Sequence, residues 1–183
     1  MKSKQAALLL MILVGSAKLI SAQEADRGDR MQDCPMHAQH AAASSHYASV
    51  DEHGDDAMGF SHEKTTHHFL LWTNGGRIEV TANELADKAS IAAIRTHLSH
   101  IAVMFANGDF AAPIFIHDGI PPGGTTMQLL KSNIRYKYEE ISLGGRVRME
   151  SNDPVAIAAI HDFLRFQISE HRTGDPLKLA EEH

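Results

Sequence analysis

Three side chains that can bind a metal ion fall on one face of a predicted helix. His97, His100 and Met104 stand three and four positions apart within the apolar stretch 91–105. Residues at these spacings lie side by side on a helix. Imidazole and thioether groups are ligands for copper, and imidazole also binds zinc. The spacing therefore predicts a metal site, and the alternative is a pair of helix-edge histidines bonded to backbone or solvent.

A second set of possible ligands lies nearer the N-terminus. Cys34, Met36, His37 and His40 occur within seven residues. A thiol, a thioether and two imidazoles can wrap a soft ion such as Cu(I) without a prebuilt site. The chain has 13 histidines in 183 residues, a bias that indicates metal contact or a response to pH. The alternative is a low-complexity segment that happens to contain these residues.

A third possibility is the dipeptide His117-Asp118, which stands in a proline-rich connection. An imidazole and a carboxylate can orient each other as an acid–base pair, although such a dipeptide is more often part of a turn. The sequence contains no glycine-rich phosphate loop, nucleophile elbow or His-Glu-x-x-His motif. It therefore predicts no catalytic residue and no organic cofactor. For His161 and His171 it predicts capping or packing.

The elements that position these residues follow from the apolar pattern. Residues 69–72 and 77–81 read as strands joined by an Asn74-Gly75 turn, which places His67 on the buried side. The helix over 91–105 carries an apolar stripe that must face a core. After an irregular connection over 110–124 and a short helix over 125–131, strands are expected at 134–141 and 146–151. A second helix then begins at Pro154.

The two halves of this pattern resemble each other. Residues 75–80 match residues 144–149, and residues 91–94 match residues 157–160. The predicted fold is α+β, with two ββα repeats forming a four-stranded antiparallel sheet and two helices packed on one face. Aligned in this way, three residues of the first unit, His67, His97 and His100, replace three aromatic residues of the second, Tyr136, Phe163 and Phe166. Such positions are usually half buried, and a buried imidazole needs a hydrogen-bond partner or a metal.

The N-terminal residues have the layout of a secretory signal peptide over 1–22, with cleavage after Ala22. Its apolar run is too short to span a bilayer, and no longer one follows, so no membrane span is expected after cleavage. Residues 23–61 are predicted to be a disordered His-rich arm, 62–175 the ββα-ββα domain and 176–183 a C-terminal tail. A single cysteine indicates no disulfide framework. The net charge of −6 makes nucleic acid a poor partner.

Three motifs, at residues 58–69 (MGFSHEKTTHHF), 112–118 (APIFIHD) and 121–123 (PPG), resemble a family of small, exported, uncharacterised bacterial proteins over about residues 58–175. Some members carry the label aspartate carbamoyltransferase, which does not fit here. The chain lacks that enzyme's Ser-Thr-Arg-Thr phosphate-binding signature and its alternating α/β pattern. Separately, residues 34–37 (CPMH) are similar to heavy-metal-binding segments of copper-efflux proteins.

Together these features predict a periplasmic or secreted metal-binding protein. The expected ion is copper, with zinc as the alternative, and the expected role is to sequester the ion or transfer it to a periplasmic metal-handling protein. Its expected ligands are the helix-face and N-terminal groups described above, together with His67. The alternatives are a small enzyme or ligand-binding module that uses the His117-Asp118 loop, and an interaction domain without metal.

Overall fold

The computed structural model describes residues 35–180. The chain divides into two compact units, residues 1–43 and 44–183, and the second contains everything after the first turns of helix α2. The predicted signal peptide and Cys34 lie outside the described residues. The elements, in chain order, are α2 (Pro35–Met58), the 3₁₀ turn η1 (His62–Lys64), β1 (Thr65–Trp72), β2 (Gly75–Ala82), α3 (Lys88–Ala106), α4 (Ala111–His117), α5 (Gly124–Leu129), the 3₁₀ turn η2 (Lys131–Asn133), β3 (Ile134–Ile141), β4 (Gly144–Ser151) and α6 (Pro154–Glu170).

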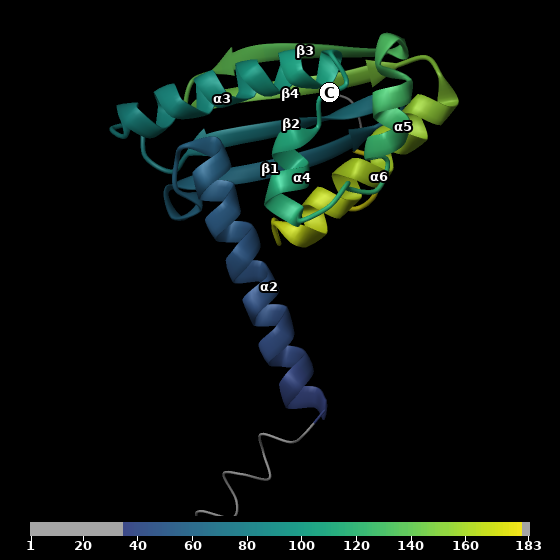
Figure 1. Cartoon of the computed structure of the whole chain (residues 1–183). Coiled ribbons are helices and arrows are strands. Elements are labelled where there is room, and N and C mark those ends of the chain that lie inside the picture. Colours follow the sequence, from purple (N-terminus) through teal and green to yellow (C-terminus); the bar gives the residue numbers. More distant parts are fainter. Residues whose placement is uncertain (1–34, 181–183) are drawn as a thin grey trace, which may run out of the picture. The chain divides into compact units, whose positions relative to one another are not determined.

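The four strands form one antiparallel sheet in the order β1-β2-β4-β3 (Figure 1), which confirms the predicted α+β class. The first turn is one residue earlier than predicted, because Trp72 pairs with Gly75 and Phe69 with Ile78. This moves each cross-strand partner by two positions, so every side chain keeps its predicted face. His67 therefore lies on the core side, opposite Val80.

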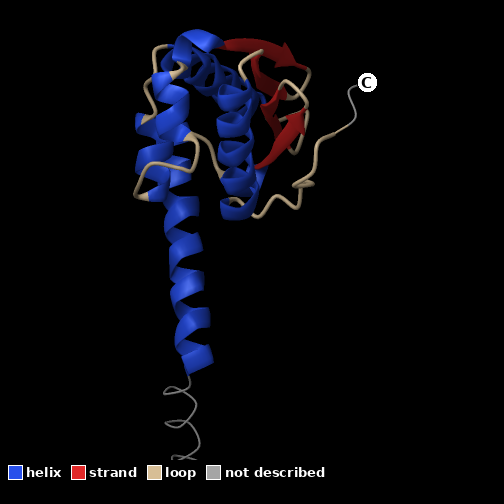
Figure 2. Ribbon diagram, turned by 90° about the vertical axis from the view of Figure 1, so that its right-hand side faces the viewer, coloured by secondary structure: helices blue, strands red, loops and turns tan. Residues whose placement is uncertain are grey.

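The helices α3 and α6 lie on the same side of the sheet, as Figure 2 shows. α3 packs mainly on β3 and β4, and α6 packs mainly on β1 and β2. Each hairpin is thus covered by the helix that follows the other hairpin. α6 begins at Pro154, as predicted, and α3 begins at Lys88, three residues before the predicted stretch 91–105. Asp87 caps α3 by accepting a hydrogen bond from the Ser90 amide, and Asp153 caps α6 by accepting one from the Val155 amide. Whether the two halves are a true internal repeat stays a prediction.

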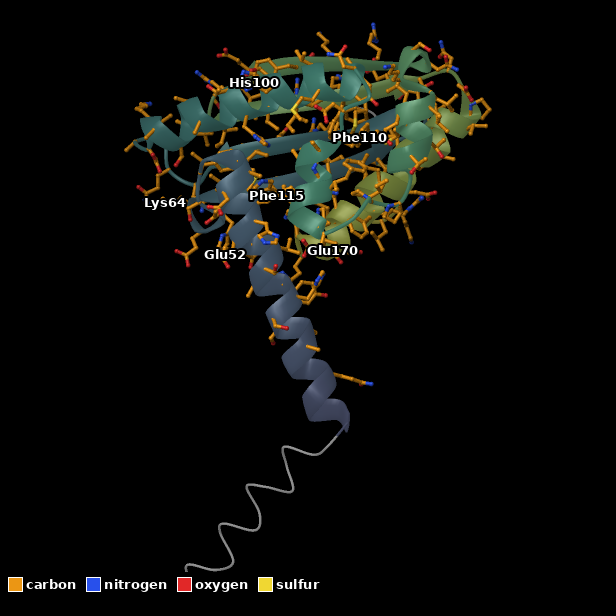
Figure 3. The ribbon with its side chains drawn as sticks, viewed as in Figure 1. Glu52, Lys64, His100, Phe110, Phe115 and Glu170 are labelled. Atoms are coloured by element: carbon orange, nitrogen blue, oxygen red, sulfur yellow. The ribbon has the colours of Figure 1, made fainter. Side chains whose placement is uncertain are left out.

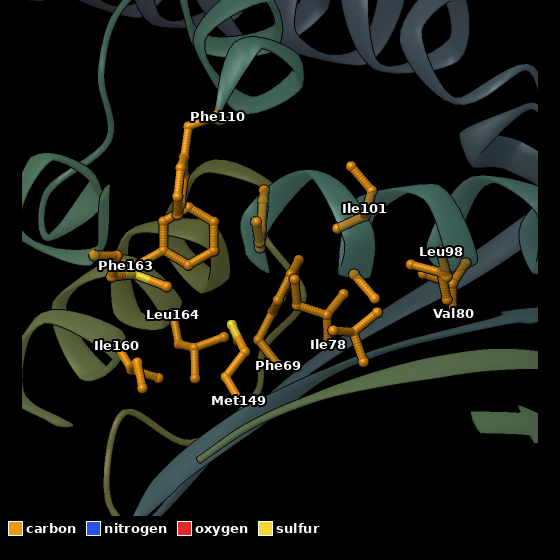
Figure 4. Close-up of a cluster of buried hydrophobic side chains, with 14 of the residues drawn as sticks. Phe69, Ile78, Val80, Leu98, Ile101, Phe110, Met149, Ile160, Phe163 and Leu164 are labelled. Carbon is orange, nitrogen blue, oxygen red and sulfur yellow. The ribbon is translucent and has the colours of Figure 1, made fainter. Parts of the chain in front are cut away.

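The core lies between this helix layer and the sheet (Figure 4). It contains the predicted stripe of α3 together with Phe69, Ile78, Val80, Val147, Met149, Ile160, Phe163 and Leu164. α3 is long and apolar enough to cross a membrane, but Ile94, Leu98 and Phe105 are buried in this core. The apolar stripe of α3 is therefore used to pack against the sheet.

Two predictions about irregular segments are wrong. Residues 35–58 form α2, whereas the sequence predicted a disordered arm over 23–61, and residues 111–117 form α4 within the supposed irregular connection. α2 contains many alanines, which favour a helix, and its second half is anchored to the domain. Val50 is 1% exposed, and Arg172 donates to both carboxylate oxygens of Asp51, at 2.7 and 2.6 Å.

Replacing Val50 with alanine is expected to lower the free energy of unfolding by about 2 kcal/mol, because two buried carbon groups are lost. Glu52→Ala is the matched control, since Glu52 is exposed on the same helix and its loss is expected to change stability by less than about 0.5 kcal/mol. Denaturant unfolding of the three proteins measures both effects. Equal stability of Val50→Ala and the parent would show that α2 is not docked in solution.

Candidate functional site

Four histidines and one methionine from five different elements converge beneath the helix layer. His67 comes from β1, His97 from α3, His117 from the end of α4 and His171 from the C-cap of α6, while Met58 ends α2. We call these five side chains the histidine cluster. Alternation along β1 turns His67 toward the core, and the last turn of α6 carries His171 over the same strand.

The cluster borders a small cavity of about 60 Å³. Met58, His67, His97 and His171 line it, and the rest of the wall is mostly apolar, including Phe69, Ile78, Val80, Leu98, Ile101, Phe105 and Phe163. A space of this size holds a few waters or one ion with small ligands. The donors therefore face a shielded space that is too small for an organic cofactor.

Contacts within the cluster run in a chain. The rings of His67 and His171 stack with centroids 5.7 Å apart and planes 6° apart. The His117 ring meets that of His171 edge-on at 5.2 Å. His67 Nε2 lies 3.3 Å from the Met58 sulfur. Phe60 packs against both His67 and His97, at ring centroid distances of 6.1 and 5.8 Å.

A second, more polar cavity of about 210 Å³ adjoins the first. Met58, His67 and His171 line both cavities. The remaining lining of the second includes Asp51, His62, Thr65, Thr66, Arg172 and Thr173. A polar wall of this kind can admit a hydrated ion, so the three shared side chains stand between a polar approach and the apolar cavity.

Burial keeps the cluster neutral at pH 7. It lowers the pKa of His67 and of His97 to about 4, and the pKa of His171 to about 3. Charge on a neighbouring histidine lowers each pKa further, through His97 for His67 and through His67 for His171. A neutral imidazole keeps a lone pair on one nitrogen, which is the form that binds a metal ion.

His117 and Asp118 point apart, contrary to the mutual orientation that the sequence suggested. The His117 side chain is 1% exposed, whereas that of Asp118 is 77% exposed. His117 Nε2 lies 3.2 Å from Gln167 Oε1, and Nδ1 lies 3.7 Å from a Glu170 oxygen, which is too far for a hydrogen bond. Asp118 ends α4 in the left-handed conformation, at φ 53°, which directs its carboxylate away from the ring.

The three predicted ligands on α3 do not all face the cavity. His97 lines the cavity, but His100 is exposed, and Figure 3 shows it on α3. Met104 stands seven residues beyond His97, which is about 10 Å along the helix axis, and it does not line the cavity. The structure thus brings together His67 and His97 of the predicted set, and not His100 or Met104. Cys34 and the side chains of Met36, His37 and His40 lie outside the described part of the chain.

The cluster residues that the sequence did not indicate as metal ligands are Met58, His117 and His171, and His117 was considered only as half of an acid–base pair. Met58 ends a helix that was not predicted, and His171 was assigned to capping or packing. His171 does cap α6, where its amide donates to the Gln167 carbonyl, but its ring also stacks on His67. His161 has the predicted packing role, with Nε2 2.7 Å from the Trp72 carbonyl oxygen.

Among the described residues, no three His, Cys, Asp or Glu side chains already surround one point at metal-binding distance. The cluster is therefore a set of neighbouring donors that would have to close around an ion. No family model, curated protein or solved structure matches the chain, and the histidine cluster is the feature on which a functional assignment rests.

Proposed function

We propose that this protein binds a transition-metal ion in the histidine cluster, with copper as the ion and zinc as the alternative, in order to sequester it or hand it on. One observation carries the proposal: three neutral imidazoles and a thioether line a single shielded cavity. Unpaired imidazoles are costly to bury, and ligation of an ion offsets that cost. Export, inferred from the N-terminal sequence, would place this activity in the periplasm or outside the cell.

The ligands expected first are Met58, His67 and His171, because these three line both cavities. The sulfur and His67 Nε2 are already 3.3 Å apart, a separation that two ligands of one ion can have. The rings of His67 and His171 stack, so ligation by both requires one ring to rotate. His97 lines the same apolar cavity as these three and would complete the site.

The donor set favours Cu(I). A thioether is a soft ligand that suits Cu(I), whereas structural zinc sites use thiolate, imidazole and carboxylate. The acidic side chains near the cluster have other partners, since Asp51 pairs with Arg172, Asp55 bonds to His62 at 3.0 Å and Glu170 bonds to His46 at 2.7 Å. A neutral site of imidazoles and a thioether holds a single positive charge at lower desolvation cost than a double one.

Titration of the purified protein with Cu(I), against a chromophoric competitor, tests the proposal. Met58→Leu, which keeps the volume, is expected to weaken Cu(I) binding by about 10- to 100-fold while changing Zn(II) binding little. His171→Phe is expected to weaken both ions, because it removes an imidazole and keeps an aromatic ring.

His100→Phe is the matched control, since His100 lies on α3 but is exposed. Its Cu(I) affinity should equal that of the parent. Absence of Cu(I), Cu(II) and Zn(II) uptake by the parent would refute the proposal. Full affinity in His171→Phe together with loss in Cys34→Ser would instead assign the ion to the segment around Cys34.

A further inference from the structure

The two edge strands of the sheet differ in whether another segment covers them. At the β1 edge, the C-terminal segment covers the strand: Asp175 accepts from the Phe69 amide at 2.9 Å, and the Ala180 amide donates to the Leu71 carbonyl at 2.7 Å. At the other edge, β3 pairs only with β4 in the part of the chain that the structure describes (Figure 1). An eight-residue edge strand with free backbone groups is a template for pairing with another strand.

The register of β4 shows which backbone groups of β3 point outward. The Ser151 amide donates to the Asn74 carbonyl, on the β2 side, so Ser151 does not bond to its β3 partner, Ile134. Because bonding alternates along an antiparallel ladder, the residues of β3 that bond to β4 are the odd-numbered ones, from 135 to 141. The amides and carbonyls of Tyr136, Tyr138 and Glu140 therefore point away from the sheet.

We propose that β3 pairs antiparallel with β3 of a second copy of this chain, about a two-fold axis at Tyr138, to make a continuous eight-stranded sheet. Such an axis is perpendicular to the sheet, so the helices of both copies stay on one side. Tyr138 then exchanges two backbone hydrogen bonds with Tyr138 of the second copy. Tyr136 pairs in the same way with Glu140 of the second copy.

Charge complementarity selects this register. With the axis at Tyr138, Lys137 lies opposite Glu139 of the second copy, and the same contact occurs twice. Within one chain Glu139 already accepts from Arg146 at 2.7 Å and lies 2.7 Å from Lys137, so each contact across the axis extends an existing ion pair. An axis at Lys137 would place two lysines opposite each other, and one at Glu139 would place two glutamates opposite each other. A slip by one residue would turn core-facing side chains to the outside. Charges on an edge strand oppose pairing with most strands, but here they match the strand itself.

The surface beside β3 also fits a second copy. A hollow of about 570 Å³ lies between α3 and β3, lined by Ala102, Val103, Ala106, Tyr136 and Tyr138, among others. Val103 is 61% exposed, and the buried hydroxyls of both tyrosines have no hydrogen-bond partner among the described residues. A second copy at this edge would cover the exposed valine.

Single charge reversals test the pairing through the mass of the particle in solution, measured by light scattering after size exclusion. The parent is expected to be a dimer at about 10 μM, the usual range for a specific interface. Lys137→Glu places glutamates opposite each other and Glu139→Lys places lysines opposite each other, so each variant should dissociate at least about tenfold more readily. An equimolar mixture of the two should form a heterodimer, because every pair is then complementary.

Lys88→Glu and Glu84→Lys make the same charge changes at exposed positions away from β3 and should stay dimeric. Glu140→Pro is a second way to block the edge, since it removes an amide that points outward and leaves the ladder to β4 intact. Thermal melts of each variant show that it is folded. A parent that is monomeric at about 100 μM, or charge variants as dimeric as the parent, would overturn the proposal.

Discussion

Lowering the pH from 7 to 5 is expected to destabilise the metal-free domain by up to about 6 kcal/mol, because three half-buried histidines resist protonation. In the folded chain the pKa is about 4 for His67 and His97 and about 3 for His171, whereas in the unfolded chain each returns to about 6.5. The unfolded state therefore takes up protons first as the pH falls. Stability is complete above pH 6.5 and is lost progressively below it, down to the folded pKa values.

A loss of this size is a large share of the total, since domains are stable by only about 5–15 kcal/mol. Denaturant unfolding at pH 7, 6 and 5 measures it, and His171→Phe should flatten the dependence by about 1.4 kcal/mol per pH unit. His100→Phe, at an exposed site, should leave the slope unchanged. Equal stability at pH 7 and pH 5 would mean that these imidazoles are not buried in solution. Protons compete with a bound ion for the same lone pairs, and in the folded chain this competition begins only near the folded pKa values of about 3 to 4.

The sheet and long helices could be predicted because each has a pattern with one physical cause. Alternation along β1 and β2 and the stripe of α3 both report burial on one side, and Asp87 and Asp153 mark helix starts. The turn position was harder. Asn74-Gly75 is a strong turn signal, yet Gly75 pairs within the ladder, where a β-carbon would lie 2.0 Å from the Met149 carbonyl oxygen. The close pairing of β2 with β4 therefore fixes the position of the turn, and the sequence of the first hairpin alone does not contain that information.

α2 was not predicted, because its sequence lacks the pattern that marks the other helices. Its residues are mostly alanine and polar groups, so it lacks the apolar stripe by which an amphipathic helix is recognised. Contacts with residues distant in sequence, such as that of Asp51 with Arg172, hold its second half, and no local pattern reports them. The same oversight hid Met58, because the helix that delivers its sulfur to His67 was not expected.

Two of the five cluster residues were predicted as ligands from the sequence, and three were not. His67 and His97 were found because the pattern placed one on the core side of a strand and the other near the apolar stripe of a helix. His171 follows the last turn of α6 and meets His67 only through tertiary packing, at a sequence distance that no local pattern spans. His100 shows the converse: spacing put it beside His97, but the rotation of α3 against the sheet leaves it exposed.

A large effect of a single substitution is expected at Gly123, which precedes α5 as its N-cap and lies against α6. Its φ is +76°, and a β-carbon there would lie 2.0 Å from the Ala159 carbonyl oxygen. The position of the β-carbon is fixed by the backbone of residue 123, and the oxygen belongs to the backbone of Ala159, so the clash can be relieved only by separating α5 from α6. This explains the Pro121-Pro122-Gly123 run: the prolines restrict the approach and the glycine permits the contact.

Gly123→Ala is accordingly expected to lower the free energy of unfolding by about 3 kcal/mol or more, as the sum of left-handed strain and overpacking. Gly59→Ala separates the two terms, because Gly59 has nearly the same φ, +74°, with no atom within 4 Å of the added carbon. Strain alone should then cost about 1 kcal/mol. Denaturant unfolding of both variants gives the difference, which measures the contact between α5 and α6. Equal losses in the free energy of unfolding for the two substitutions would show that α5 is not packed on α6 in solution. The contact of α5 would then not help to hold α6, and with it His171, over β1.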